Sequence, residues 1–508
     1  MASRQAFKKD SSFFRMLAVG AVGAQSVQQY LNSLGHQVIE LESGSLATRI
    51  WRDVKRKRVR IPDLCCTRCG VRIESRAKTS ADLSMSHSPR EAERAWHYGM
   101  VDSDWIAFPI LSVEESEWNL GSLREGRSLW RERTLTFLHV EGLINLFTVG
   151  SLKSITPQQR KPKGVTEGSE IQVKWKARFA PGDGRVIRVE NGSLYYRLES
   201  KLESLRHFRL ASNEEAFLSP EEQFKKNQVL AGQVTPLTGN ACHCAGGCTT
   251  EKIKQMLASR ERTVRFTGCK LAKVTKDTGL ADQIQELAED TAEDPYVRME
   301  AKSYLCEVRG DSADKVFAST LLGDSDDQMR LEAAIALAEI GTQSSFELLC
   351  KVLNDHQQPL FLRRACAWGI GCHGTPESGR VLVRAFRDVE PEIRREALVA
   401  LQDIGTVALD ALLEGLQDSS SDIASGAAET LRRIDGLPVE QVAEKLTALL
   451  TNSAASTWPT WALANLPKEA VLPHIESLQD EKVRYAVSVL WAFLESWIAE
   501  DWTPKSTP

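Results

Sequence analysis

The sequence lacks a run of about 18 apolar residues, the length needed to cross the hydrocarbon part of a bilayer. The first ten residues hold no apolar core of a secretory signal, and the apolar run 16–24 is short and rich in Gly and Ala. We therefore expect a cytoplasmic protein with no membrane partner.

Several chemical motifs are also absent. The sequence contains no Walker A loop, no dinucleotide-binding glycine pattern, no HExxH and no nucleophile elbow. These absences exclude the common nucleotide-binding, zinc-protease and serine-hydrolase classes. Eleven cysteines are present, and in a cytoplasmic chain they indicate metal sites or buried thiols rather than disulfides.

The net charge of −4 hides a division between the two halves of the chain. Residues 1–270 hold 42 Lys and Arg against 29 Asp and Glu, whereas the remainder holds 22 against 39. A basic half joined to an acidic half indicates one part that faces nucleic acid and another that faces a different partner.

The stretch 60–78 reads as two short strands joined by a Cys-x-x-Cys-Gly turn. Alternation along the second strand places Glu74, Arg76 and Lys78 on one face, and Asp63 is expected at the end of the preceding strand. Two nearby carboxylates can hold a hard divalent cation, and a neighbouring lysine can position water or phosphate.

The Pro62-Asp63 pair followed by Glu74 and Lys78 resembles the PD-(D/E)xK, or restriction-endonuclease-like, nuclease superfamily. The resemblance covers about the first 150 residues, and it implies a small mixed sheet flanked by helices and hydrolysis of a nucleic-acid backbone. It also implies Mg²⁺ or Mn²⁺ bound by Asp63 and Glu74, with Lys78 as the third catalytic residue. The sequence departs from the pattern because Arg76 stands where the family has its lysine, so a site that binds without cutting is the alternative.

A run of basic residues directly precedes this motif. Together with Arg76 of the motif, the run forms a candidate phosphate-binding surface. Arg94, in a short predicted helix, is a further candidate phosphate contact. The run consists of Lys55, Arg56, Lys57, Arg58 and Arg60.

Two groups of cysteines are candidate metal ligands. Cys66 and Cys69 form half of a zinc knuckle, and His87 and His97 are candidates to complete it. The second group, which includes glycine-rich residues 242–248, fits a structural zinc site; an iron–sulfur cluster or free thiols are the alternatives. Its ligands would be Cys242, Cys244, Cys248 and either Cys269 or His243.

Between these cysteine groups the sequence predicts a small β-rich region. Residues 171–179 alternate as one half-buried strand, with Lys174, Lys176 and Arg178 on one face and Trp175 on the other. Asn191-Gly192 predicts a two-residue hairpin turn.

From about residue 278 one helical pattern recurs, and each copy ends at a glycine. The intervals between these glycines are 31, 33, 31 and 31 residues, and such a period means stacked two-helix units. The pattern resembles HEAT repeats, which implies a surface for a protein partner or for self-association. The glycines are Gly310, Gly341, Gly374, Gly405 and Gly436.

The sequence therefore predicts a multidomain α+β protein. Residues 1–150 would form the nuclease-like domain, 151–275 a β-rich domain with the cysteine cluster, and 276–508 a helical-repeat domain. The predicted function is metal-dependent hydrolysis of nucleic acid, with DNA as the expected substrate, and the domain combination suits phage defence in bacteria. The alternative is a non-catalytic nucleic-acid-binding adaptor or scaffold that works through its repeats.

Overall fold

The computed structural model describes residues 11–41, 59–89, 92–112, 131–147, 152–154, 171–247, 249–323, 326–452, 457–471 and 473–474. Contacts divide them into two compact units, an N-terminal unit that ends at Tyr304 and a C-terminal unit that begins at Leu305. The three-domain boundaries drawn from the sequence stay a prediction. Within the described ranges, no helix combines the length and the apolar character required to cross a membrane.

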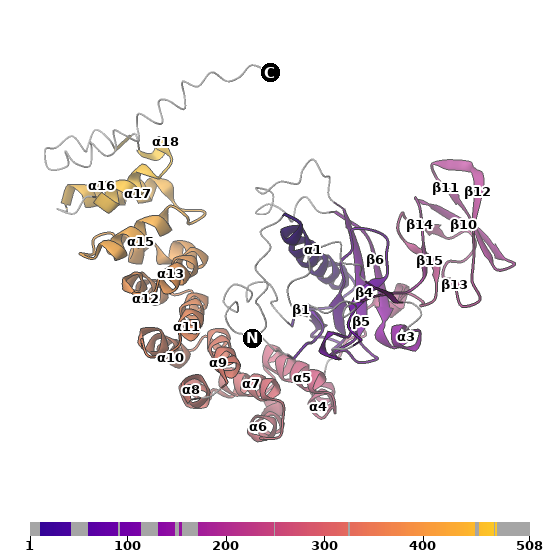
Figure 1. Cartoon of the computed structure of the whole chain (residues 1–508), viewed down its shortest axis with the longest axis horizontal. Coiled ribbons are helices and arrows are strands. Elements are labelled where there is room, and N and C mark those ends of the chain that lie inside the picture. The colour runs from indigo at the N-terminus through magenta and orange to yellow at the C-terminus, as the bar shows by residue number, and fades with distance from the viewer. Residues whose placement is uncertain are drawn as a thin grey trace, which may run out of the picture. The chain divides into compact units, whose positions relative to one another are not determined.

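A five-stranded mixed sheet forms the first layer of the N-terminal unit. Its spatial order is β1-β2-β3-β5-β6, in which β3 and β5 are parallel and the other neighbours are antiparallel. Helix α1 (Ser11–Ser33) lies along one face of this sheet (Figure 1). The strands are β1 (Val38–Glu40), β2 (Leu64–Cys66), β3 (Arg72–Ser75), β5 (Trp105–Ser112) and β6 (Arg131–His139).

The residues of α1 and of the sheet explain their packing. Val27 and Leu31 lie on one face of the helix and are fully buried against Leu64 and Ile73. Side chains alternate across a strand, so Glu74, the neighbour of Ile73, faces away from α1. This alternation along β3 agrees with the sequence prediction, as do the helix and the strands that follow it.

Short strands build three smaller sheets in the same unit. Their orders are β12-β11-β10-β14, β13-β15-β9 and β4-β8-β7. The strands are β4 (Ser84–His87), β7 (Leu152–Ser154), β8 (Ile171–Lys174), β9 (Ala177–Phe179), β10 (Gly184–Glu190), β11 (Ser193–Leu198), β12 (Lys201–Arg209), β13 (Glu215–Ala216), β14 (Gln223–Phe224) and β15 (Val229–Gly232).

The hairpin predicted at Asn191-Gly192 is present, and both residues have positive φ. The single strand predicted over residues 171–179 is wrong, because β8 and β9 belong to different sheets. The chain leaves one sheet for the other at Trp175, whose ring is buried against Trp96 and whose indole N–H donates to the Leu143 carbonyl. Burial of this ring stabilises the break that periodicity alone does not reveal.

The N-terminal unit ends in helices packed in pairs. Their neighbours are α4 with α5, α5 with α7 and α6 with α7. The helices of this unit after β6 are α3 (Val140–Asn145), α4 (Thr250–Leu257), α5 (Arg262–Thr275), α6 (Ala281–Glu289) and α7 (Pro295–Tyr304).

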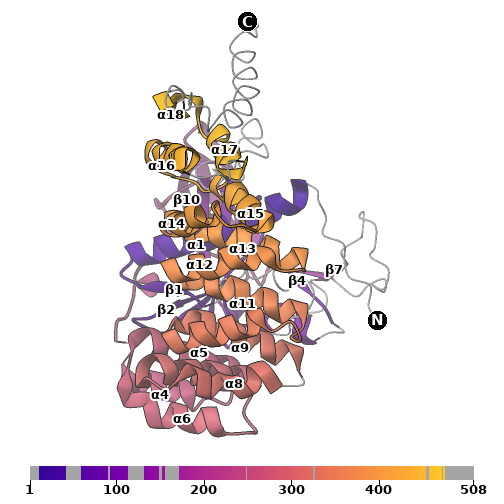
Figure 2. The same cartoon turned by 90° about the vertical axis from the view of Figure 1, so that its left-hand side faces the viewer.

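The C-terminal unit consists of helices that stack in succession, as α9, α11, α13 and α15 do in Figure 2. All five glycines of the predicted period have positive φ, between +60° and +84°. Glycine adopts this conformation without the steric cost that other residues meet, and Gly341, Gly374 and Gly405 directly follow α9, α11 and α13. The helices are α8 (Ala313–Gly323), α9 (Asp327–Ile340), α10 (Gln343–Asn354), α11 (Leu360–His373), α12 (Pro376–Arg384), α13 (Pro391–Ile404), α14 (Leu409–Gly415), α15 (Ser421–Leu431), α16 (Val439–Asn452), α17 (Thr457–Ala464) and α18 (Lys468–Val471).

Helices α9, α11 and α13 each carry an arginine at the same position near their start, and the three arginines make equivalent hydrogen bonds. Arg330, Arg363 and Arg394 each donate to a main-chain carbonyl that precedes their own helix. Each arginine thereby satisfies a carbonyl near the junction between consecutive helices. The acceptors are the carbonyls of Leu321, Leu353 and Asp388 at 2.9, 2.9 and 2.6 Å.

Candidate anion-binding pocket and cysteine cluster

The hairpin formed by β2 and β3 positions the two carboxylates singled out in the sequence. Leu64 pairs with Ile73, and Asp63 directly precedes Leu64, so the register sets Asp63 beside Glu74. The Asp63 carboxylate accepts a hydrogen bond from the Ser75 main-chain N–H at 2.9 Å. Glu74 is only 5% exposed, and Arg76 pairs with it at 2.5 Å. Both carboxylates therefore already have partners within the chain.

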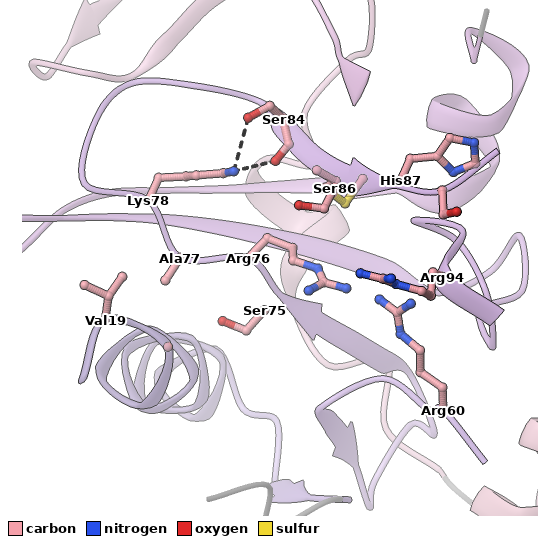
Figure 3. Close-up of a pocket in the computed structure, with 13 residues that line it drawn as sticks. Val19, Arg60, Ser75, Arg76, Ala77, Lys78, Ser84, Ser86, His87 and Arg94 are labelled. Carbon is pink, nitrogen blue, oxygen red and sulfur yellow. Dashed lines mark hydrogen bonds between the residues drawn. The ribbon is translucent and has the colours of Figure 1, made fainter. Parts of the chain in front are cut away.

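Lys78 lies further along the same chain segment, and its ammonium group is directed toward β4 (Figure 3). It donates to the carbonyl and to the hydroxyl of Ser84. Burial lowers the pKa of Lys78, while the nearby Asp82 opposes that change. The ammonium group thus has acceptors on β4 rather than a free position beside Glu74.

Arg60, Arg76 and Arg94 reach into a common cavity of about 430 Å³, which we name the cationic pocket. Their guanidinium groups are directed toward one another in Figure 3. The Arg60 guanidinium also donates to the Ala95 carbonyl at 3.1 Å, which fixes its direction. The described residues that line the pocket are Val19, Gly20, Arg60, Ser75, Arg76, Ala77, Lys78, Ser84, Met85, Ser86, His87, Ser88 and Arg94.

The lining of the cationic pocket is basic and hydroxyl-rich. None of the lining residues that the structure describes is an aspartate or glutamate; Glu74 pairs with Arg76, and Asp82 pairs with Lys174. Burial lowers the pKa of His87, so its imidazole is neutral at neutral pH. Like charges gathered in one cavity repel one another, and an anion placed among them relieves that repulsion.

The structure places only some of the predicted phosphate contacts. Arg60, Arg76 and Arg94 line the cationic pocket, whereas Lys55, Arg56, Lys57 and Arg58 lie outside the described residues. Sequence reasoning missed the hydroxyl groups of Ser84 and Ser86. Their only signal was the alternation of Leu83 and Met85 with Ser84 and Ser86, which is typical of a strand.

The predicted cysteine ligands come together in a different combination. Cys66 and Cys69 lie with His36 and Cys244, and the four ligand atoms are all within 4.8 Å of one another. His36 lies at the start of the first predicted strand, and no short metal-ligand spacing connects it to the cysteines in the sequence. His87 and His97, considered as completing ligands, are outside this group.

The other predicted ligands of the second cluster are elsewhere. Cys242 lies two residues before Cys244 in the sequence, but it does not belong to the group of His36, Cys66, Cys69 and Cys244. Its side chain is buried, and burial raises the pKa of its thiol. Cys269 is completely buried within α5, where burial raises its pKa strongly. Cys248 lies outside the described residues. The cause of the difference is packing, because Cys242 and Cys244 pack in the core of the first sheet together with Val38.

The thiols of Cys66 and Cys69 shift each other's pKa in opposite directions. Their mutual hydrogen bond lowers the pKa of Cys66 to about 4 and raises that of Cys69, and burial raises the pKa of both thiols. His36 also lowers the pKa of Cys66.

Comparison with known proteins identifies the repeats. Residues 315–402 and 381–467 match a model of HEAT repeats. The C-terminal helices are HEAT repeats. No curated protein matches the sequence. The resemblance of the first 150 residues to PD-(D/E)xK nucleases has no support from these comparisons and stays a prediction.

Solved structures similar to this chain include other repeat proteins. One is human deoxyhypusine hydroxylase in complex with glycerol, at 18% identity, with 45% of this chain and 99% of that chain covered and a TM-score of 0.19. Another is the CpcE–CpcF complex of phycocyanin lyase from Nostoc, at 16% identity over 50% and 96% of the two chains, with a TM-score of 0.24. A designed armadillo repeat protein in complex with a (KR)4 peptide gives 17% identity over 48% and 98%, with a TM-score of 0.19.

Proposed function

We propose that this protein is a nucleic-acid-binding adaptor. Its cationic pocket holds a backbone phosphate, and its HEAT repeats hold a protein partner. The observation that carries the proposal is the convergence of Arg60, Arg76 and Arg94 in one cavity.

Phosphate fits the chemistry of this pocket. Each guanidinium group presents a planar fork of N–H donors that matches phosphate oxygens. The hydroxyl group of Ser86 adds a donor on the same cavity, whereas the Ser84 hydroxyl already donates to Asp82. The excess of basic residues in 1–270 favours an extended nucleic acid over a single free phosphate.

Metal-dependent cleavage is the second candidate, and one observation favours it. The hairpin register sets Asp63 beside Glu74, the arrangement that two carboxylates need to hold one cation. Against it, Asp63 accepts from Ser75, Glu74 is paired with Arg76, and Lys78 is bonded to Ser84. Binding of a cation would require the two carboxylates to exchange these partners.

The adaptor proposal is tested by measuring affinity for single- and double-stranded DNA and RNA over a range of salt concentrations. We expect Arg76→Gln and Arg94→Gln each to weaken binding and to reduce the slope of log affinity against log salt by about 0.9, the value for one phosphate contact on a duplex. Arg185→Gln is the matched control, because Arg185 is an exposed arginine of β10 paired with Glu221. Equal affinity and slope in the wild type and both pocket variants would refute the pocket as the phosphate site.

The same samples decide between binding and cleavage. Incubation with Mg²⁺ or Mn²⁺, and with EDTA, is compared for the wild type, Asp63→Ala and Glu74→Ala. Metal-dependent cutting that both substitutions abolish would establish the second candidate. Salt-sensitive binding without cutting supports the adaptor.

The repeats offer a specific surface for the protein partner. A cavity of about 610 Å³ is lined by Trp458 and Trp461, with Arg394 and Arg395 among the other lining residues. The two indole rings lie 6.3 Å apart at their centroids. The lining also contains Asp422 and Glu429, so an acidic side chain of a partner would have to meet Arg394 and Arg395 while an adjacent apolar group meets the indoles.

An array of short peptides tests this surface. Acidic peptides that contain one large apolar residue should bind the full-length protein, and Trp461→Ala should abolish that binding. Equal binding of basic peptides, or binding that Trp461→Ala leaves intact, would show that this cavity is not the partner site.

A further inference from the structure

We propose that His36, Cys66, Cys69 and Cys244 bind one structural zinc ion. This assignment is independent of the nucleic-acid proposal. The four residues come from three separate segments: the loop between α1 and β1, the β2–β3 hairpin, and the chain that follows the short helix Gly239–Cys242.

Two separations between ligand atoms match a tetrahedral zinc site, and all four atoms lie within 4.8 Å of one another. With Zn–S bonds of about 2.3 Å and Zn–N bonds of about 2.0–2.1 Å, a tetrahedron places two sulfurs about 3.8 Å apart, and a sulfur and a nitrogen about 3.6 Å apart. The Sγ atoms of Cys66 and Cys244 are 3.9 Å apart. The Cys69 Sγ and the His36 Nδ1 are 3.5 Å apart.

The surroundings prepare each ligand for metal. The Nε2 of His36 lies 2.8 Å from the Cys242 carbonyl, which has no proton to give, so Nε2 carries the proton and Nδ1 keeps its lone pair toward Cys69. This partner outside the ligand set holds the ring in the tautomer that a metal requires. The Gln37 main-chain N–H donates to the Cys66 Sγ at 3.4 Å, as it would to a thiolate ligand.

Burial and charge agree with a closed structural site. His36, Cys66 and Cys69 are each less than 9% exposed, so thiolates here need a cation in place of water. Three thiolates and one imidazole around Zn²⁺ leave a net charge of −1. Lys252 donates to the Cys69 carbonyl and Arg68 to the Gly35 carbonyl, so two cations are held beside the ligand-bearing segments.

Four protein ligands leave no open position, so the ion would have a structural role. It would join the hairpin that carries Asp63 and Glu74 to α1 and to the segment that carries Cys244. The site explains why Cys66 and Cys69 flank a tight turn, in which Gly70 has a φ of +72°.

The proposal is tested on the full-length protein by elemental analysis after expression in zinc-supplemented medium. We expect one zinc ion per chain in the wild type and loss of zinc in Cys66→Ser, Cys244→Ser and His36→Gln. Cys242→Ser and Cys269→Ser are the matched controls, since both residues are buried but lie outside the four-residue group. Wild-type protein without zinc, iron with inorganic sulfide in its place, or equal zinc loss in Cys269→Ser would overturn the proposal.

A second measurement remains informative if a ligand variant fails to fold. A mercurial reagent added to wild-type protein should release zinc as it modifies three thiols, which mass spectrometry should identify as those of Cys66, Cys69 and Cys244. Release that follows modification of a different set of thiols would refute the assignment. In cobalt-substituted protein, a thiolate-to-metal charge-transfer band and intense d–d absorption would support tetrahedral sulfur ligation, and weak octahedral absorption would refute it.

Discussion

The buried ion pair between Arg72 on β3 and Asp104 before β5 allows a quantitative prediction. The guanidinium group donates to both carboxylate oxygens, at 2.9 and 2.6 Å, and both side chains are at most 3% exposed. Replacement of Arg72 by methionine keeps the apolar stem but leaves the Asp104 carboxylate buried without its cation. We expect Arg72→Met to destabilise the N-terminal unit by about 3–5 kcal/mol, the usual cost of one uncompensated charge.

Hydrogen–deuterium exchange of peptides from β3 and β5 measures this loss within the full-length chain. At about 1.4 kcal/mol per factor of ten, exchange should be faster by about two to nearly four orders of magnitude. The double variant Arg72→Met with Asp104→Asn should recover part of the loss, because the amide is neutral and its oxygen can still accept from Val101. An exchange rate within a factor of about five of the wild type in Arg72→Met would refute the reasoning.

The pH dependence of this prediction follows from Asp104. Burial raises the pKa of Asp104, and Arg72 opposes that rise. The folded chain therefore keeps the proton in a range above about pH 3.9 where the unfolded chain has lost it, and stability falls as the pH rises through that range. Without Arg72 the range extends upward, so Arg72→Met should lose less stability near about pH 4 than near about pH 7.

Three further predictions concern other parts of the molecule. Gly99→Ala should lower the free energy of unfolding by at least about 1–3 kcal/mol, since Gly99 has a φ of +83° and the added Cβ would lie 1.8 Å from the Arg60 carbonyl oxygen. The resulting shift of Arg60 should also weaken nucleic-acid binding. Chemical denaturation measures the first effect and a binding assay the second. Arg363→Met should cost about 3–5 kcal/mol by leaving the buried Asp388 unpaired, whereas loss of the exposed pair in Arg387→Ala should cost less than about 1 kcal/mol, as calorimetry can show. Removal of zinc by a chelator should lower the thermal midpoint of the wild-type N-terminal unit and leave that of Cys244→Ser unchanged, as site-resolved exchange during heating would report.

The repeats were the part of the fold most open to prediction from sequence. Their signal is local, because a glycine directly follows each of α9, α11 and α13 and each leading arginine binds a nearby carbonyl. The strand that carries Ile73 and Glu74 could also be predicted from the sequence, since alternation with period two is a property of neighbouring residues. The break at Trp175 could not be predicted, because it depends on tertiary burial of one ring.

The cysteine cluster shows where sequence reasoning ends. Cys66 and Cys244 are 178 residues apart, and no spacing rule connects them. The sequence prediction grouped Cys242 and Cys269 with Cys244, and it did not consider His36 as a ligand. For the same reason, only part of the cationic pocket could be predicted from the sequence. Arg60 belongs to a basic run that the sequence shows, but its proximity to Arg94 results from folding.

The closure of the first sheet by a late segment has a consequence for biosynthesis. The His36 ring contacts the Cys242 carbonyl 206 residues further along the chain, and Leu237 pairs with Phe137. During translation, α1 and the early strands must therefore wait for most of the N-terminal unit before that side of their core is covered. A nascent chain arrested near residue 150 would expose apolar surface to chaperones, and so would a protein cut at that point.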